Sequence, residues 1–314
     1  MSKILCIGEA LIDMICTDRG KALSEGEQFL KKAGGAPTNV AAAVAALGGR
    51  VELAARVGVD PFGQHLVEIM NGFGVDTRYM LRDPEHFTTF AFVSLMENGE
   101  RDFYFNRGAD GYLSKADIEQ ISLEETGLVH FGSATGFLPG PLNEAYVYLL
   151  QQAKARNIFI SFDPNYRHLL FRDSIPSFIE QSWHFLENCD FFKLSDEEAI
   201  LLTGTATVEK AASQLLQKTN AVFAITLGKE GTLLGRDGQT SLIGSIAVKP
   251  VDSTGAGDAF VGAVLYQLKD LDHHQLSEDD WRKIIFNANK AGARTCEYLG
   301  AMEAFRYLSN DIFK

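Results

Sequence analysis

The sequence has few cysteines and no long apolar run, and each shortage excludes a class of protein. Its 314 residues include only four cysteines, at positions 6, 16, 189 and 296. They form no CxxC pair and have no neighbouring histidine, which argues against a zinc site or a disulfide scaffold, so we expect four buried, reduced thiols. The longest apolar stretch, Val40 to Leu47, is far shorter than the roughly 20 residues that cross a bilayer. We therefore expect no transmembrane segment.

Positive charge is also scarce. The chain has 29 Lys and Arg against 41 Asp and Glu, a formal net charge of −12, and such a field repels a nucleic-acid backbone and an anionic membrane surface. We expect neither as a partner. A local phosphate site remains allowed, because backbone amides and one or two cations bind phosphate against a negative global field.

Linkers and targeting segments are missing as well. The apolar start of the chain is interrupted by Glu9 and Asp13 before a signal-peptide core reaches full length, which predicts a cytoplasmic protein. No repeat or Pro/Ser-rich linker divides the chain. With 46% apolar residues, we expect one domain over residues 1–314.

Alternating strand and helix patterns run through the chain. Apolar, β-branched runs predict strands, and the first two, at 3–8 and 51–57, are followed by helices predicted over 34–49 and 63–72. Further strands are predicted at residues 127–131, 158–163, 191–193 and 222–226. This rhythm is typical of an α/β fold with a mostly parallel sheet, and ligands of such sheets bind at the carboxyl ends of the strands.

One segment departs from this rhythm. Residues 88–110 hold two aromatic-rich runs joined by a turn-like segment at 97–100, which predicts a β-hairpin that projects as a lid over a cleft. We expect one apolar face of this hairpin to exclude water from the closed site, and it carries Phe90, Phe92, Phe103 and Phe105. Packing within the lid or dimerisation explains the same face equally well.

The most informative segment is DSTGAGDAF, residues 252–260, read as a Gly-rich turn between a strand at 246–251 and a helix. Converging backbone amides and the positive end of the helix dipole predict an anion hole for a transferring phosphoryl group. Asp258 beside that hole is placed to take a proton from an attacking hydroxyl. The alternative is a first-turn Asp that only complements the helix dipole. The chain lacks both GxGxxG and GxxxxGK[ST], so the Rossmann and P-loop interpretations weaken.

Three motifs together resemble one family. They are DSTGAGDAF, GGAPTNV at 34–40 and RVGVDPFG at 56–63, and the likeness to the ribokinase-like (PfkB) sugar kinases runs from Ile4 to about Ala301. The resemblance implies a three-layer α/β/α fold with a mostly parallel central sheet. It also implies a small β-sheet lid, formed by segments around 10–35 and 87–112.

The resemblance assigns roles on the sugar side. Asp13 and Asn39 would bind sugar hydroxyls, and Gly34 and Gly35 would let the sugar approach the backbone, whereas a solvated loop residue and a helix-entry turn are the alternatives for Asp13 and the glycines. The phosphoryl group would meet the amides of Gly255, Ala256 and Gly257. Asp258 would be the base, and Arg167 of the DPNYR segment at 163–167 would supply positive charge.

The nucleotide and metal sites follow from the same resemblance. Thr226, Gly228 and Gly231 would contact ATP, and Asn289 would flank the adenine, although a polar residue on a helix face explains Asn289 nearly as well. Mg²⁺ would sit on ATP oxygens and water near Glu198. Ser195 stands where the family has Asn, which leaves Asn165 or Lys193 for the second contact. Asp252 would line a site for K⁺.

The lid should select the substrate. Asp110, with Arg107, Phe92 and Phe105, would contact the sugar, and an extra carboxylate favours a neutral sugar over an acid. We therefore expect an ATP-dependent fructokinase that phosphorylates a primary hydroxyl of fructose and forms a homodimer through the lid. Arg107 keeps a 2-keto-3-deoxygluconate kinase open, and a ribokinase is a further alternative. A non-catalytic sugar- or nucleotide-binding protein and a dinucleotide-dependent dehydrogenase are the other classes considered.

Overall fold

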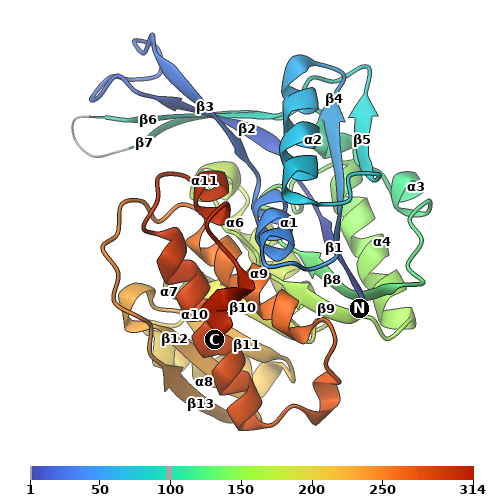
Figure 1. Cartoon of the computed structure of the whole chain (residues 1–314), viewed down its shortest axis with the longest axis vertical. Coiled ribbons are helices and arrows are strands. Elements are labelled where there is room, and N and C mark those ends of the chain that lie inside the picture. The colour runs from blue at the N-terminus through green and yellow to red at the C-terminus, as the bar shows by residue number, and fades with distance from the viewer. Residues whose placement is uncertain (1, 97–100) are drawn as a thin grey trace.

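Two β-sheets organise the molecule (Figure 1). The computed structural model describes residues 2–96 and 101–314. The large sheet has nine strands in the order β13-β12-β11-β10-β9-β8-β1-β4-β5. The pairs β11–β12 and β12–β13 are antiparallel, and all other neighbouring strands are parallel. Its strands are β1 (Lys3–Ile7), β4 (Val51–Gly58), β5 (Met80–Asp83), β8 (Thr126–Phe131), β9 (Phe159–Phe162), β10 (Phe191–Ser195), β11 (Val222–Thr226), β12 (Thr232–Arg236) and β13 (Gln239–Ile243).

Helices cover both faces of this sheet, and two apolar cores separate the layers. One core is shared with α1 (Ala36–Ala46), α2 (Pro61–Phe73), α9 (Ala256–Leu268), α10 (Glu278–Thr295) and α11 (Ala301–Phe305). The other is shared with α3 (Lys115–Ile118), α4 (Pro141–Ala155), α5 (His168–Phe171), α6 (Ile175–Leu186), α7 (Asp196–Thr203) and α8 (Val208–Lys218). The predicted three-layer arrangement is confirmed.

Burial of the strands on both faces explains why runs of apolar residues predicted their positions. In β1, Ile4 and Cys6 face one core while Leu5 and Ile7 face the other, so the strand is apolar on both faces, as in most parallel sheets. All the strands expected from 3–8 to 222–226 are present, with ends within two residues of the prediction. The two predicted helices form α1 and α2.

The RVGVDPFG segment shapes the start of α2. Asp60 caps the helix by accepting from the backbone N–H of Phe62 at 2.9 Å and of Gly63 at 2.8 Å, and Pro61 begins the first turn. The second carboxylate oxygen of Asp60 accepts from the N–H of Thr88 at 2.7 Å. The motif therefore ties α2 to the point where the chain enters the small sheet.

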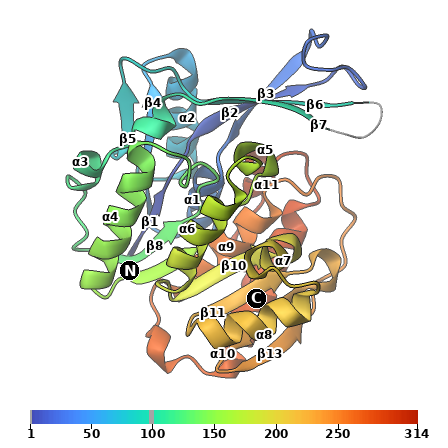
Figure 2. The ribbon, with the colours of Figure 1, turned by 180° about the vertical axis from the view of Figure 1, so that it is seen from behind.

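The small sheet has the order β3-β2-β6-β7 and lies beyond the carboxyl end of β1. Its strands are β2 (Leu11–Cys16), β3 (Phe29–Gly34), β6 (Phe90–Leu95) and β7 (Arg101–Asn106). Seen from behind, it extends past the large sheet above α5 and α11 (Figure 2). The predicted hairpin is confirmed as β6 and β7, whereas its turn at 97–100 lies outside the described residues.

The strand predicted at 246–251 is wrong. The segment has no regular structure, and Val251 is exposed, with its N–H donating to the carbonyl of Cys296 at 2.7 Å. The sheet ends at β13, which offers this run no partner strand within the described chain. β-branched residues favour a strand only where a neighbour pairs with them.

The cysteine prediction is confirmed in part. All four thiols are free, but only Cys6 and Cys189 are buried, while Cys16 and Cys296 are half-buried. Among the described residues, no helix is long and apolar enough to cross a membrane.

Candidate active site

The Gly-rich turn before α9 is shaped by its glycines. Gly255 has φ of 82°, a left-handed conformation, and a Cβ there would lie 2.4 Å from the Cβ of Ala301. A residue with a side chain would therefore be strained and would clash with α11. α9 begins at the next residue, so the positive dipole end of its first turn lies at this point. The N–H of Ala256 donates to the carbonyl of Ser253 at 3.2 Å, so the predicted contact of this amide with a phosphoryl group is not free to form in this conformation.

Asp258, in this first turn, faces α1. Its Oδ2 accepts a hydrogen bond of 2.8 Å from Nδ2 of Asn39. Burial raises the pKa of Asp258 above its ordinary value, and the Asn39 hydrogen bond and the charges of Arg167 and Lys193 oppose that rise. Oδ1 of Asn39 is buried and has no partner among the described residues. The carboxylate of Asp258 and the unpartnered Oδ1 of Asn39 thus belong to one hydrogen-bonded pair.

Asp13 lies on β2, close to the end of β3. A Cβ on Gly34 would lie 2.1 Å from Oδ2 of Asp13, and a Cβ on Gly35 would lie 2.4 Å from the backbone oxygen of Glu9. The two glycines are thus needed by the protein's own packing, a different reason from the approach of a sugar. Burial raises the pKa of Asp13 to about 6, while the guanidinium of Arg167 lowers it. Asp13 is a strand residue and not the solvated loop residue of the alternative.

Arg167 connects the two carboxylates electrostatically. Its side chain is exposed, and its charge lowers the pKa of both Asp13 and Asp258. Asn165 precedes it with φ of 46°, and Nδ2 of Asn165 donates to the carbonyl of Gly132 at 2.9 Å. The segment 163–167 therefore leaves the end of β9 in a fixed turn that carries the exposed guanidinium of Arg167, which donates to the carbonyl of Tyr166 at 3.2 Å.

A buried ion pair lies beneath this turn. Nζ of Lys193, on β10, is 3.2 Å from Oδ2 of Asp163, which directly follows β9. Asp163 stands in the DPNYR segment, but we had given it no role of its own. The signal that was available is an acidic residue at the carboxyl end of an apolar strand.

Glu198 lies in the first turn of α7 and forms a capping box with Ser195. Its Oε2 accepts from the N–H of Ser195 at 2.7 Å, and its Oε1 accepts from the N–H of Tyr166 at 2.8 Å. Ser195 in turn accepts from the N–H of Glu198 at 3.1 Å. Both carboxylate oxygens are thus occupied by backbone donors, and they hold the 163–167 segment against α7.

Asp252 joins two loops. Its Oδ1 accepts from the N–H and the hydroxyl of Thr254 at 3.0 and 2.8 Å, and its Oδ2 accepts from the N–H of Gly300 at 2.9 Å. Burial would raise the pKa of Asp252, but these hydrogen bonds outweigh it and hold the pKa below its ordinary value. The carboxylate therefore stays charged at the start of the anion hole.

The residues expected to contact nucleotide lie around the ends of β11 and β12. Thr226 ends β11 and its hydroxyl donates to the carbonyl of Leu194 at 3.3 Å. Gly228 and Gly231 both have positive φ, 58° and 110°. Asn289 is 6% exposed, accepts from the hydroxyl of Thr232 at 2.6 Å and donates to the carbonyls after β13. The polar groups of Asn289 thus bind protein, which favours the helix-face alternative.

The register of the lid corrects the predicted aromatic face. Phe92 pairs with Tyr104, and Ala91 pairs with Phe105. Neighbouring strand residues alternate between faces, so Phe90 and Phe92 lie on one face while Phe103 and Phe105 lie on the other. Phe90 packs against Phe62 of α2 with ring centroids 4.8 Å apart. The pairing of Asp13 with Ala91 places Phe105, and not Phe92, on the face of Asp13.

Arg107 and Asp110 lie just after β7, where the chain leaves the small sheet. Asp110 is 1% exposed and accepts hydrogen bonds from the hydroxyls of Thr89 and Thr135, the latter at 2.8 Å. Arg107 donates to the carbonyl of Pro139 at 2.9 Å and of Thr135 at 3.3 Å. In this conformation both side chains bind protein groups, so neither is free for a sugar.

Glu9 lies between β1 and β2, where the chain passes from the large sheet to the small one, and the sequence motifs assigned it no role in the site. It is buried and accepts from the N–H of Ala36 at 3.1 Å and from the hydroxyls of Ser133 and Thr135. Burial raises its pKa to about 6. Thr135 therefore bridges Glu9 to Asp110, and so links the large sheet to the lid.

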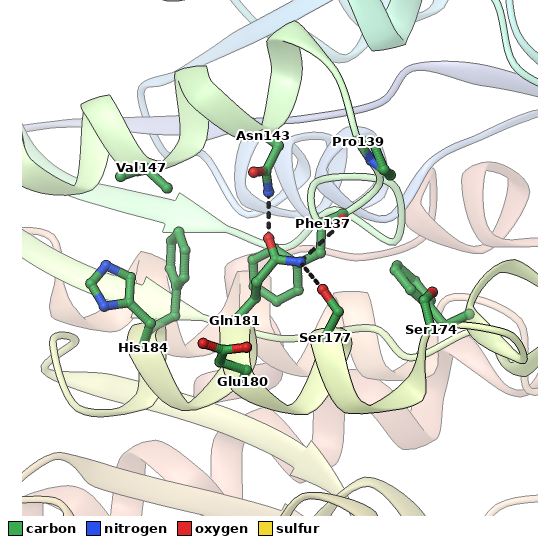
Figure 3. A pocket seen from close by; sticks show the side chains of 11 residues that line it. Phe137, Pro139, Asn143, Val147, Ser174, Ser177, Glu180, Gln181 and His184 are labelled. Atoms are coloured by element: carbon green, nitrogen blue, oxygen red, sulfur yellow. Dashed lines mark hydrogen bonds between the residues drawn. The ribbon is translucent and has the colours of Figure 1, made fainter.

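A cavity away from this site lies between two helices. It has a volume of about 610 Å³ between α4 and α6, where Gln181 bonds to Asn143, to Ser177 and to the carbonyl of Phe137 (Figure 3). None of the predicted site residues lines it.

Comparisons with known proteins agree with this geometry. The sequence model of the pfkB family carbohydrate kinases matches residues 1–306. A probable fructokinase-2 of Arabidopsis thaliana is 35% identical over 305 residues, which are 96% of this chain and 92% of that protein. The fructokinase of Vibrio cholerae O395, solved with fructose, ADP and calcium, is 31% identical, with a TM-score of 0.83 over 100% of this chain and 98% of that one.

A third relative is more distant in sequence. A putative ribokinase II of E. coli, solved with ATP and Mg²⁺, is 27% identical, with a TM-score of 0.85 over 100% of this chain and 98% of that one. The family match, the identities and the shared fold lead to one conclusion. The chain belongs to the pfkB family of carbohydrate kinases.

Proposed function

We propose that this protein is an ATP-dependent fructokinase, which transfers the γ-phosphoryl group of ATP to a primary hydroxyl of fructose. The observation that carries the proposal is the placement of Asp258 in the first turn of α9, where it is hydrogen-bonded to Asn39 and, like Asp13, lies within the electrostatic reach of Arg167. The fructokinase relatives, matched over almost the whole chain, support fructose as the substrate.

Each group has a part in the transfer. Asp13 and the free Oδ1 of Asn39 accept hydrogen bonds from sugar hydroxyls and hold the reacting hydroxyl next to Asp258. Asp258 takes the hydroxyl proton as the oxygen attacks phosphorus in line with the leaving ADP oxygen. The amides of Gly255 and Gly257 stabilise the charge on the phosphoryl oxygens, and Arg167 offsets the repulsion between anions.

Magnesium fits this site as a companion of ATP. Among residues 2–96 and 101–314, no three acidic, His or Cys side chains gather as a metal site, and both oxygens of Glu198 already accept from the backbone. We propose that Glu198 and the adjacent Asn165 orient metal-bound water. When bound with ATP, Mg²⁺ would offset the negative charge of the phosphate groups.

Potassium is proposed as an activator. The carboxylate of Asp252 holds the 252–254 turn to Gly300, and we propose that it shapes a cation site formed by the carbonyls of these two loops. Turnover measured with K⁺ and with a bulky organic cation tests this directly. The four free cysteines accord with a reducing compartment, and we propose the cytoplasm.

A neutral sugar is favoured over an acidic one. In 2-keto-3-deoxygluconate kinases an Arg reads the substrate carboxylate, but Arg107 donates here to two backbone carbonyls and lies 3.6 Å from the carboxylate of Asp110. The positive charge of Arg107 is therefore already offset by Asp110, which supports a neutral sugar such as fructose as the substrate over an acidic one.

A homodimer through the lid is also proposed. The face of the small sheet that bears Asp13 continues outward as an apolar surface made by Ile15, Leu30, Val93, Leu95 and Phe103, of which Ile15, Leu30 and Leu95 are exposed. A second copy of the chain would cover this surface.

Substitution of the base tests the mechanism. Asp258→Asn keeps the size of the side chain but cannot take a proton, so kcat should fall by about 10²- to 10⁴-fold. Fructose binding, measured by calorimetry without nucleotide, should remain nearly unchanged. An unchanged kcat would reject Asp258 as the base.

A further inference from the structure

Lys193 is the one charged residue of the buried strand β10. It is 7% exposed, and lysines so deeply buried need a partner charge. Its Nζ lies 3.2 Å from Oδ2 of Asp163, at the carboxyl end of the neighbouring strand β9. The two side chains therefore form an ion pair at the edge of the sheet where ligands of parallel sheets bind.

The ammonium of this pair lies under the Gly-rich turn. A Cβ placed on Gly257 would be 3.3 Å from Nζ of Lys193. The same charge lowers the pKa of Asp258. The ammonium is thus next to the first turn of α9, where the proposed function places the transferring phosphoryl group.

Asp163 is too deeply buried to contact a ligand directly. It is 1% exposed, its Oδ1 accepts from the N–H of Asn165 at 3.2 Å, and apart from the ammonium its Oδ2 has no polar partner in the described chain. Its effect on a ligand must therefore pass through Lys193.

Stability alone is a weak reason for this arrangement. The cost of removing two charges from water about cancels their attraction, so a buried ion pair adds little compared with apolar residues of the same size. Lys193 also has other acids within electrostatic range, because Glu198 and Asp258 both raise its pKa together with Asp163. Without Asp163, the ammonium would turn toward these acids.

We propose that Asp163 is a positioning residue that holds the ammonium of Lys193 against the transferring phosphoryl group and keeps it from pairing with the base Asp258. This rests on the proposed function. The ammonium donates to a phosphoryl oxygen and neutralises charge that develops there, while the carboxylate of Asp258 stays free for the sugar hydroxyl.

The experiment compares Asp163→Asn, Lys193→Met and the double variant with the wild-type enzyme. Asp163→Asn should lower kcat roughly 10- to 100-fold, as a misplaced catalytic group does, with the fructose dissociation constant within about twofold of wild type. The double variant should recover the melting temperature lost in Asp163→Asn, because no buried charge is left unpaired, but it should not recover kcat.

A matched control breaks a buried ion pair far from the site. Glu52→Gln removes the nearer carboxylate partner of Lys3, whose Nζ lies 3.0 Å from Glu52 and 3.9 Å from the exposed Glu125, at the amino ends of β1 and β4. It should lower the melting temperature without a selective loss of kcat. If Asp163→Asn behaves like Glu52→Gln, or if the double variant recovers kcat, Asp163 has a structural role only and the proposal is wrong.

Measurements of nucleotide binding distinguish failure of this proposal from failure of the proposed function. The wild-type protein should bind a non-hydrolysable MgATP analogue more tightly than MgADP, and Asp163→Asn should lose that preference. A wild-type protein that turns over no sugar, but whose preference disappears in Asp163→Asn, would contradict the kinase assignment and keep the positioning role. Retained preference in the variant would overturn the positioning role itself.

Discussion

At the scale of single residues, the site depends on the hydrogen bond between Asn39 and Asp258. Nδ2 of Asn39 donates to Asp258, the proposed base, at 2.8 Å and favours the charged form of its carboxyl. Both residues were predicted from the sequence, because they stand in two short motifs. Their mutual bond was not predicted, since more than 200 residues separate them and only the packing of α1 on α9 brings them together.

Asn39→Ala should shift the pH profile. A base is active only when deprotonated, so kcat/KM falls as the pH drops through the pKa of Asp258. Loss of the hydrogen bond raises that pKa further, so the acidic limb should move to higher pH, with about a tenfold or larger loss of activity on that limb. The measurement is kcat/KM for fructose from pH 5 to 8. An acidic limb that stays in place would contradict the link between Asn39 and the base.

Gly34→Ala should act on the sugar side. The new Cβ would lie 2.1 Å from Oδ2 of Asp13, so the carboxylate must move away from its position in the cleft. KM for fructose should rise about tenfold or more, because a hydrogen bond to a charged acceptor is lost. Steady-state kinetics measure this, and a KM equal to that of the wild type would show that Asp13 does not bind the sugar.

At the scale of elements, the packing and pairing of helices and strands determined features of the structure that sequence patterns could not predict. The run at 246–251 has the composition of a strand but no partner. The lid aromatics are spaced two apart on each strand, which makes each pair share a face, but only the register between β6 and β7 shows that the two pairs face opposite ways. Asp110 and Asn289 were expected to contact ligands, but their polar partners come from distant segments and bury them.

The packing of α1 against α9 positions Asn39 next to Asp258. A Cβ on Gly262 would lie 2.7 Å from the Cβ of Ala43. Gly262→Ala should push the helices apart, lower kcat and reduce stability by roughly 1–3 kcal/mol, as overpacking does. Kinetics and denaturant unfolding measure the two effects.

Gly72→Ala is the matched control. Gly72 lies in α2, and a Cβ there would have nothing within 4 Å. Because alanine is a better helix former than glycine, the free energy of unfolding of this control should rise by roughly 0.5–1 kcal/mol, and its kcat should stay at the wild-type value. If Gly262→Ala also kept the wild-type kcat, the spacing of α1 and α9 would not control the site.

At the scale of the whole molecule, the apolar outer part of the lid predicts the oligomeric state. The chain should elute at twice its 34.5 kDa mass in light scattering after size-exclusion chromatography. Leu30→Glu places a charge in the exposed lid face and should yield monomers. Tyr104→Glu changes a side chain that is 61% exposed on the opposite face and should stay dimeric. A monomeric wild type would reject the lid interface.

The central claim concerns the substrate, and one measurement tests it most directly. Coupled ADP release with MgATP is compared across fructose, ribose, glucose, adenosine and 2-keto-3-deoxygluconate, with Asp258→Asn as the blank. We expect turnover with fructose far above that with the others, and little ADP release without sugar, because the transfer needs an oriented hydroxyl beside Asp258. A preference for 2-keto-3-deoxygluconate would contradict our account of Arg107, and no turnover with any sugar would contradict the kinase assignment itself.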